Sequence, residues 1–196
     1  MKLRWICAVC GLLCAWTASC QGRAEQLLSQ MQTTLAAYGA YVADFSVEIE
    51  GMAMEGTMAV EGEHYWIRMG QMEACGDHQL RYEINHDRRE VMLMPVEPES
   101  ANLLSNPAQA FALVAGSESA LLAEQRGTAE LLVMPKNEQG QIRLWLDAQN
   151  GLPSKIRYEQ EGVGVDIQIR SIRKRSESLP HYEASRYADY EVIDFR

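Results

Sequence analysis

The feature that most constrains the fold is an apolar residue at every second position in a series of short runs. Phe45, Val47 and Ile49 alternate with polar residues, and Gly51 ends the run. Alternation of this kind is typical of a strand with one apolar face. The same spacing recurs around 58–60, 65–69, 80–84, 91–93, 120–126, 129–134, 142–146, 156–158 and 163–169, with a short run at 191–195. The pattern predicts about ten short strands in an antiparallel meander.

Two helices accompany these predicted strands. Residues 25–38 place apolar side chains at helical spacing, and a glycine follows. A second, short helix is predicted over 108–115, because Asn106 and Pro107 are typical of a helix start. We therefore expect a mainly β fold with helices (α+β), in which a strongly curved antiparallel sheet has its apolar face covered by helices.

The first twenty residues have the pattern of a signal peptide. Lys2 and Arg4 precede an apolar run over 5–16, and small residues occupy 17–19. We therefore predict export to the periplasm and a single mature domain over 24–196. The segment that ends at Cys20 also resembles a loose bacterial lipobox, in which the cysteine is acylated. Acylation of Cys20 and plain signal cleavage nearby both stay open at this point.

Charge and cysteine content narrow the functional class. The chain has 27 acidic and 18 basic residues, a net charge of −9 that argues against nucleic-acid binding. Four of the five cysteines lie in or beside the signal segment, so only Cys75 belongs to the mature domain. An internal disulfide of the mature domain is therefore not expected.

Motifs of catalysis and metal binding are absent from the sequence. It contains neither a nucleophile elbow nor a phosphate-binding glycine loop. The four histidines do not have zinc-helix spacing, and we interpret them as exposed turn residues. The sequence therefore predicts no enzyme activity, no metal and no cofactor. Cys75 is interpreted as a structural residue at the entrance of a strand.

Methionine is frequent in the mature domain. Nine methionines follow residue 20. Flexible, polarisable methionine side chains suit an apolar pocket that adapts to variable cargo, although they also fill gaps in ordinary cores.

The order of several local motifs resembles that of the outer-membrane lipoprotein carrier proteins (LolA-like), in the version of Bacteroidetes-type bacteria. The motifs lie at 44–46, 55–58, 75–77, 106–111, 150–153 and 187–194, so the resemblance spans nearly the whole mature chain. One departure concerns an Arg-Pro pair after the second strand, which helps to close the lid in better-studied carriers. Here Gly62 and Glu63 occupy that segment.

The resemblance implies an incomplete antiparallel β-barrel with a helical lid and an apolar cavity. It also implies a periplasmic carrier that binds the acyl chains of lipoproteins and moves them toward the outer membrane. The expected partners are an inner-membrane lipoprotein-releasing transporter and an outer-membrane acceptor, and we expect a monomer. The alternative is a membrane-anchored lipoprotein receptor, or a lipid-sensing regulatory module, of the same fold. The predicted lipid-binding wall consists of Phe45, Val47, Ile49, Met58, Val60, Tyr65, Ile67, Met69, Leu80, Tyr82, Ile84, Val91 and Leu93, with Phe111 and Val114 facing it from the lid.

Overall fold

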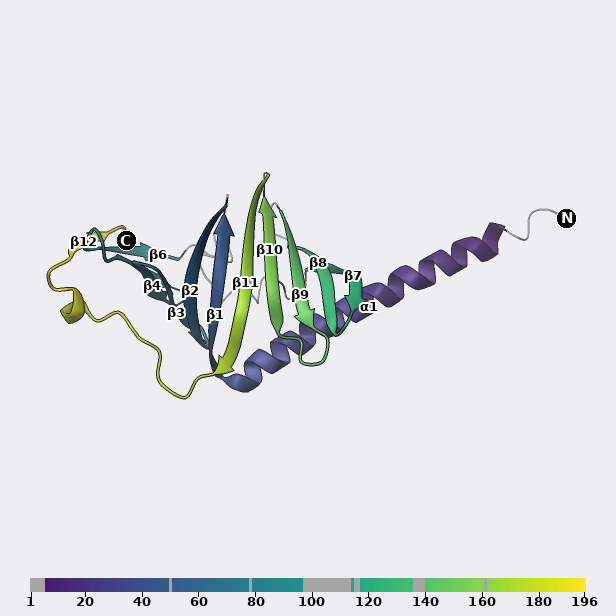
Figure 1. The fold of residues 1–196 in the computed structure, drawn as a ribbon, viewed down its shortest axis with the longest axis horizontal. Helices are drawn as coiled ribbons and strands as arrows, with labels where there is room; N and C mark the ends of the chain where they lie inside the picture. Colours follow the sequence, from purple (N-terminus) through teal and green to yellow (C-terminus); the bar gives the residue numbers. More distant parts are fainter. Residues whose placement is uncertain are drawn as a thin grey trace.

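The computed structural model describes residues 6–49, 51–77, 79–96, 114, 117–135, 140–160 and 162–196, with side chains from residue 22 onward except 160 and 163. Within these residues, twelve strands form one sheet in the order β12-β6-β5-β4-β3-β2-β1-β11-β10-β9-β8-β7. The sheet curves strongly and is open at both edges (Figure 1). The strands are β1 Ala40–Ile49, β2 Met52–Glu61, β3 His64–Met69, β4 Met72–Gly76, β5 Leu80–Asn85, β6 Glu90–Pro95, β7 Glu118–Gln125, β8 Thr128–Met134, β9 Gln141–Asp147, β10 Pro153–Gln160, β11 Val163–Lys174 and β12 Glu191–Asp194.

Short hairpins produce this strand order. The turns after β1 and β2 place Gly51 and Gly62 at φ of 82° and 60°, a left-handed conformation that glycine adopts without strain. Each strand therefore pairs with its sequence neighbour over β1–β6 and over β7–β11. Antiparallel pairing of β1 with β11 joins the two meanders in the middle of the sheet. The predicted fold class is confirmed.

One long helix, α1 (Ile6–Tyr38), precedes the sheet. Its C-terminal end agrees with the prediction, because Gly39 follows at φ of 70° and its amide bonds to the carbonyl of Ala36. Its start differs: the helix begins at residue 6, not 25, since residues 6–24 contain no proline and many good helix formers. No helix in the described residues has the length and hydropathy that a membrane crossing requires. The signal peptide over 1–20 and the domain 24–196 stay predictions.

Helix α1 lies across the β7–β11 half of the sheet (Figure 1). Arg23 forms an ion pair with Glu124 of β7 at 2.8 Å. Further along α1, the loop between β9 and β10 contacts the helix. The hydroxyl of Thr34 donates a hydrogen bond to the carbonyl of Asn150 in that loop at 2.7 Å. A Cβ at Gly151 of the same loop would lie 2.7 Å from a helix backbone nitrogen, so glycine permits this close approach.

The two faces of the sheet have different covers. The inner face, defined as the face that packs on α1, holds the main core. Its α1-covered half contains branched aliphatic residues that are almost fully buried: Leu131, Val133, Ile142, Leu144, Leu146, Ile156 and Ile167, with Ala129 and Val165. They pack against Leu27, Leu28, Met31 and Leu35 of α1. This burial is the main source of stability for that half of the domain.

The outer face, opposite to α1, is covered over β2–β6 by the C-terminal strap, defined as residues 175–196. The strap leaves β11, crosses the outer face and contains a 3₁₀ helix, η2 (Ala184–Tyr187), before β12. It ends by pairing β12 in parallel with the edge strand β6. Leu179 and Tyr187 of the strap are buried against the sheet. The final strand predicted at 191–195 is thus confirmed.

Two elements differ from the sequence prediction or lie outside the described residues. Strand β4 was not predicted, because its outward residue Glu73 interrupts the apolar pattern although it is buried. The helix predicted over 108–115 lies outside the described residues except for Val114, which is helical and buried.

Candidate functional site

Eight residues of the predicted lipid-binding wall do share the inner face. Strand register places them side by side, because Phe45 pairs with Gly56, Met58 with Ile67, and Val60 with Tyr65. Val114 belongs to the same buried cluster, and Phe111 lies outside the described residues. The eight residues are Phe45, Val47, Ile49, Met58, Val60, Tyr65, Ile67 and Met69.

The other five wall residues lie on the outer face, which corrects the prediction of a single wall. Glu83 pairs with Ala74, an inner-face residue, so the neighbouring positions of β5 point outward. The physical reason is that the C-terminal strap supplies a second apolar layer: Tyr182 stacks on Tyr82 with ring centroids 4.2 Å apart. The five residues are Leu80, Tyr82, Ile84, Val91 and Leu93; Leu80 and Tyr82 are partly buried and the other three are buried.

Methionine is concentrated on the inner face of β2–β6, the half of the sheet away from the main contacts of α1. Seven of the nine mature methionines lie there by register: Met52, Met54, Met58, Met69, Met72, Met92 and Met94. Four of them are partly buried, whereas Met52, Met54 and Met72 are 67%, 46% and 38% exposed. The inner face therefore has an aliphatic half beneath α1 and a methionine half beside it, which we call the methionine face.

A glycine permits close packing on this face. A Cβ at Gly56 would lie 2.6 Å from the ring of Phe45 and 2.9 Å from Cγ of Met69. Both side chains therefore pack against the backbone of β2, in space that only glycine leaves open.

The methionine face contains two charged residues on β5, between the methionines of β4 and those of β6. The side chains of Arg81 and Glu83 on β5 lie on the inner face. They form an ion pair at 2.5 Å, and both are largely buried. Burial raises the pKa of the nearby Tyr65 to about 12. The methionine face thus combines an apolar surface with one ion pair.

A buried carboxylate fastens the C-terminal strap to the outer face. Glu73 accepts a hydrogen bond from the Trp66 indole at 2.7 Å and a longer one from the Tyr187 hydroxyl at 3.5 Å. His86 connects Glu73 to the Tyr190 hydroxyl through its two ring nitrogens, at 3.1 and 3.0 Å. His86 lies in the β5–β6 turn as predicted, but it is partly buried and hydrogen-bonded, so the prediction that it is exposed is wrong. The contacts of His86 with Glu73 and Tyr190 join different elements, so the sequence pattern did not indicate them.

Cys75 lies inside β4 and is buried, next to this carboxylate. Burial, followed by the negative charge of Glu73, raises the pKa of the Cys75 thiol to about 12. A thiol that stays protonated is a poor nucleophile. The interpretation of Cys75 as structural agrees with this environment, although it lies within a strand and not at its entrance.

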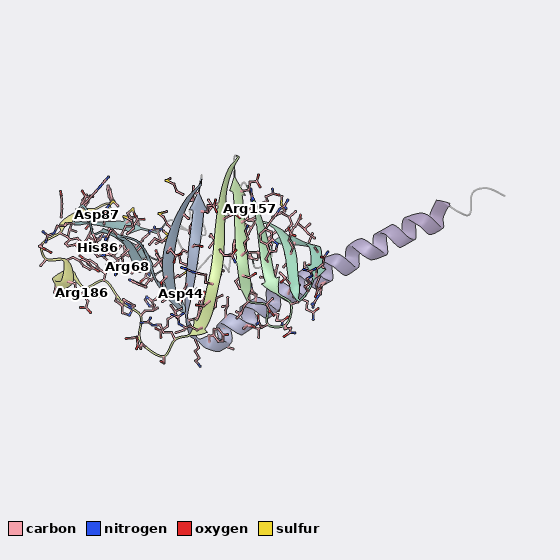
Figure 2. All side chains as sticks on the ribbon, viewed as in Figure 1. Asp44, Arg68, His86, Asp87, Arg157 and Arg186 are labelled. Atoms are coloured by element: carbon pink, nitrogen blue, oxygen red, sulfur yellow. The ribbon has the colours of Figure 1, made fainter. Side chains whose placement is uncertain are left out.

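The basic run at the end of β11 is largely neutralised. Arg170 forms an ion pair with Glu55, and Arg173 forms one with Asp44. The hydrogen bond from Arg173 lowers the pKa of the Asp44 carboxyl. Beside Arg170, the outer face has an open hollow of about 300 Å³ that is also lined by Trp66 and Arg68. Figure 2 shows Asp44, Arg68 and His86 on the side of the sheet that carries β1–β6.

Comparisons with known proteins support the fold. No protein-family model and no curated protein sequence matches the chain. An uncharacterised conserved protein from Thermus thermophilus matches with a TM-score of 0.57 at 10% identity, over 86% of this chain and 97% of that chain. An outer-membrane lipoprotein-sorting protein domain from Vibrio parahaemolyticus matches with a TM-score of 0.48 at 9% identity, over 86% and 97%.

A LolA superfamily protein from Nitrosomonas europaea also matches, with a TM-score of 0.45 at 10% identity, over 80% of this chain and 94% of that chain. These identities are all low, so the similarity concerns the fold. The Bacteroidetes-type version of the family stays a prediction. The chain has a curved, open sheet with a helical cover, which is the architecture that the sequence predicts.

Proposed function

We propose that this protein is a periplasmic carrier that binds the acyl chains of lipoproteins on the methionine face and moves them toward the outer membrane. The observation that carries the proposal is the partition of the inner face. Its aliphatic half is closed by α1, whereas its other half is lined by seven methionines that include three exposed ones. The protein would act by binding, without a chemical step.

The physical basis is the burial of methylene groups. Each buried methylene contributes about 0.8 kcal/mol, so roughly ten methylenes of one chain would contribute about 8 kcal/mol before the entropy of ordering is subtracted. Methionine has three rotatable bonds and no branch, so a methionine surface can adjust to chains of different length and number. Phe45 and Met69, which pack closely over Gly56, belong to the same apolar surface.

The ion pair of Arg81 and Glu83 fits the same function. An acylated protein presents its lipid next to a polar peptide and ester groups. A charged pair beside Met92 and Met94 would meet those groups while the neighbouring methionines hold the chains. Loading by an inner-membrane transporter and delivery to an outer-membrane acceptor belong to this proposal.

The second candidate is a membrane-anchored receptor of the same fold. The observation that favours it is the position of Cys20 relative to the first contact of α1. Arg23, three residues later, already binds Glu124 of β7. An acyl anchor on Cys20 would therefore hold the domain directly at a membrane, without a flexible linker. Growth of cells with a clickable fatty acid separates the candidates: label retained on Cys20 favours the receptor, and an unlabelled mature chain favours the carrier.

The carrier proposal is tested by the binding of a palmitoylated peptide to the purified mature protein. Met54→Asp would place a charge on the methionine face and is expected to weaken binding at least about tenfold. Met134→Asp is the matched control, because Met134 is 47% exposed, close to the 46% of Met54, but lies at the end of β8 on the other half of the sheet. Equal binding by both variants, or no binding by the unmodified protein, contradicts the proposal.

A further inference from the structure

We infer that Met52, Met54 and Met72 form a reversible oxidation site, at which conversion of the thioethers to sulfoxides makes the methionine face polar and releases acyl cargo. The site itself follows from the position and exposure of these three residues. The effect on cargo rests on the proposed function.

The three methionines lie at one end of the methionine face. Met52 and Met54 pair with Ile49 and Val47 next to the β1–β2 turn, and Met72 pairs with Met69 at the β3–β4 turn. All three point to the inner side of the sheet, where acyl chains would lie. They are also the most exposed methionines of that face.

Exposure decides which thioethers react. A peroxide transfers one oxygen to the methionine sulfur: the O–O bond breaks, the S=O bond forms, and water leaves from hydrogen peroxide, while the sulfur is oxidised by two electrons. Sulfur atoms at a surface meet the oxidant, whereas Met31 of α1 is 0% exposed and protected by the core. On the inner face the expected order of oxidation therefore begins with Met52 and Met54, Met134 of the outer face reacts at a rate close to that of Met54, and Met31 reacts last.

The composition of the two halves makes the effect local. The half beneath α1 holds leucine, isoleucine and valine, which have no oxidisable sulfur. Oxidation therefore changes the methionine face and leaves the half beneath α1 unchanged. Each sulfoxide places a strong hydrogen-bond acceptor on an apolar surface, and a lipid chain cannot satisfy it. Reduction by a methionine sulfoxide reductase would restore the thioether and the apolar surface.

The test treats the purified mature protein with hydrogen peroxide and follows each methionine by peptide mass spectrometry. Palmitoylated-peptide binding is measured before treatment, after treatment, and after incubation with MsrA and MsrB. We expect early oxidation of Met52, Met54 and Met72, a loss of binding of about tenfold, and recovery after reduction. The far-UV circular dichroism of the oxidised protein reports whether the fold is retained.

Variants separate the site from general damage. Each is compared with itself before and after peroxide. The triple variant M52L, M54L and M72L is expected to keep its own binding after treatment, whereas M134L is expected to lose binding like the parent.

Early oxidation of Met31, or failure of the reductases to reverse the three sulfoxides, overturns the site. Unchanged binding after oxidation overturns the effect on cargo while the proposed function stands. No binding by untreated protein contradicts the proposed function, and the order of oxidation then still decides the site.

Discussion

Replacing Gly56 by alanine tests how tightly the inner face is packed beneath Phe45. The added Cβ would lie 2.6 and 2.8 Å from two ring carbons of Phe45 and 2.9 Å from Cγ of Met69. Carbon atoms prefer separations of about 3.5–4.0 Å, so the ring must move by roughly 1 Å out of a buried position. Overpacking of this kind costs about 1–3 kcal/mol.

Part of this cost is offset in the unfolded chain. Alanine restricts the unfolded backbone more than glycine does, which stabilises the folded state by about 0.4–1 kcal/mol where the backbone conformation is allowed. Gly56 lies within a strand and is not among the glycines with positive φ. The free energy of unfolding should therefore fall by roughly 1–2 kcal/mol.

The assay is urea unfolding of the mature protein, followed by circular dichroism, with Gly164→Ala as the control. Gly164 lies in β11, where an added Cβ would come no closer than 3.5 Å to the flexible end of Arg157. That substitution should leave stability unchanged or raise it. The double variant G56A and F45L should recover part of the loss. Equal stability of Gly56→Ala and Gly164→Ala would refute the tight packing that we describe between Phe45 and Gly56.

The remaining predictions concern the strap and the helix contact. The Cys75 thiol should react with a disulfide reagent only after unfolding, because burial and the charge of Glu73 raise its pKa to about 12. Glu73→Ala should lower the free energy of unfolding by roughly 2–3 kcal/mol, since the Trp66 indole and its neighbours lose their acceptor. The same variant should speed proteolysis within the C-terminal strap, which limited trypsin digestion would detect. Gly151→Ala should cost about 2 kcal/mol or more in thermal unfolding, because its φ is 73° and a Cβ would meet the backbone of Met31.

Local sequence pattern predicted most of the elements but not their layers. Alternation around Phe45 identified β1, and the glycine after Tyr38 identified the end of α1. Strand β4 was missed because a glutamate in the sequence indicates an exposed position. Glu73 is in fact buried, and the Trp66 indole donates a hydrogen bond to it. Since the side-chain period of a strand is two, one missed strand removes the information on which face the next strand presents. Tyr82 was therefore assigned to the wrong face.

The same limit applies to the candidate site. The number of methionines suggested an adaptable apolar surface, but seven of them come from four strands, and only the pairing register places them on one face. The polar network around His86 joins β4, the turn after β5 and the C-terminal strap. Residues separated by a hundred positions meet there, and spacing along the chain contains no signal for that contact.

The most direct test of the central claim is photo-crosslinking with a peptide that carries a diazirine in its acyl chain. The purified mature protein is irradiated with this peptide, and the labelled residues are identified by mass spectrometry. We expect label on the inner positions of β1–β4, above all at Met54, Met58 and Met69. Label confined to the outer face, such as the hollow beside Trp66, or no specific label at saturating peptide, would contradict lipid binding on the methionine face.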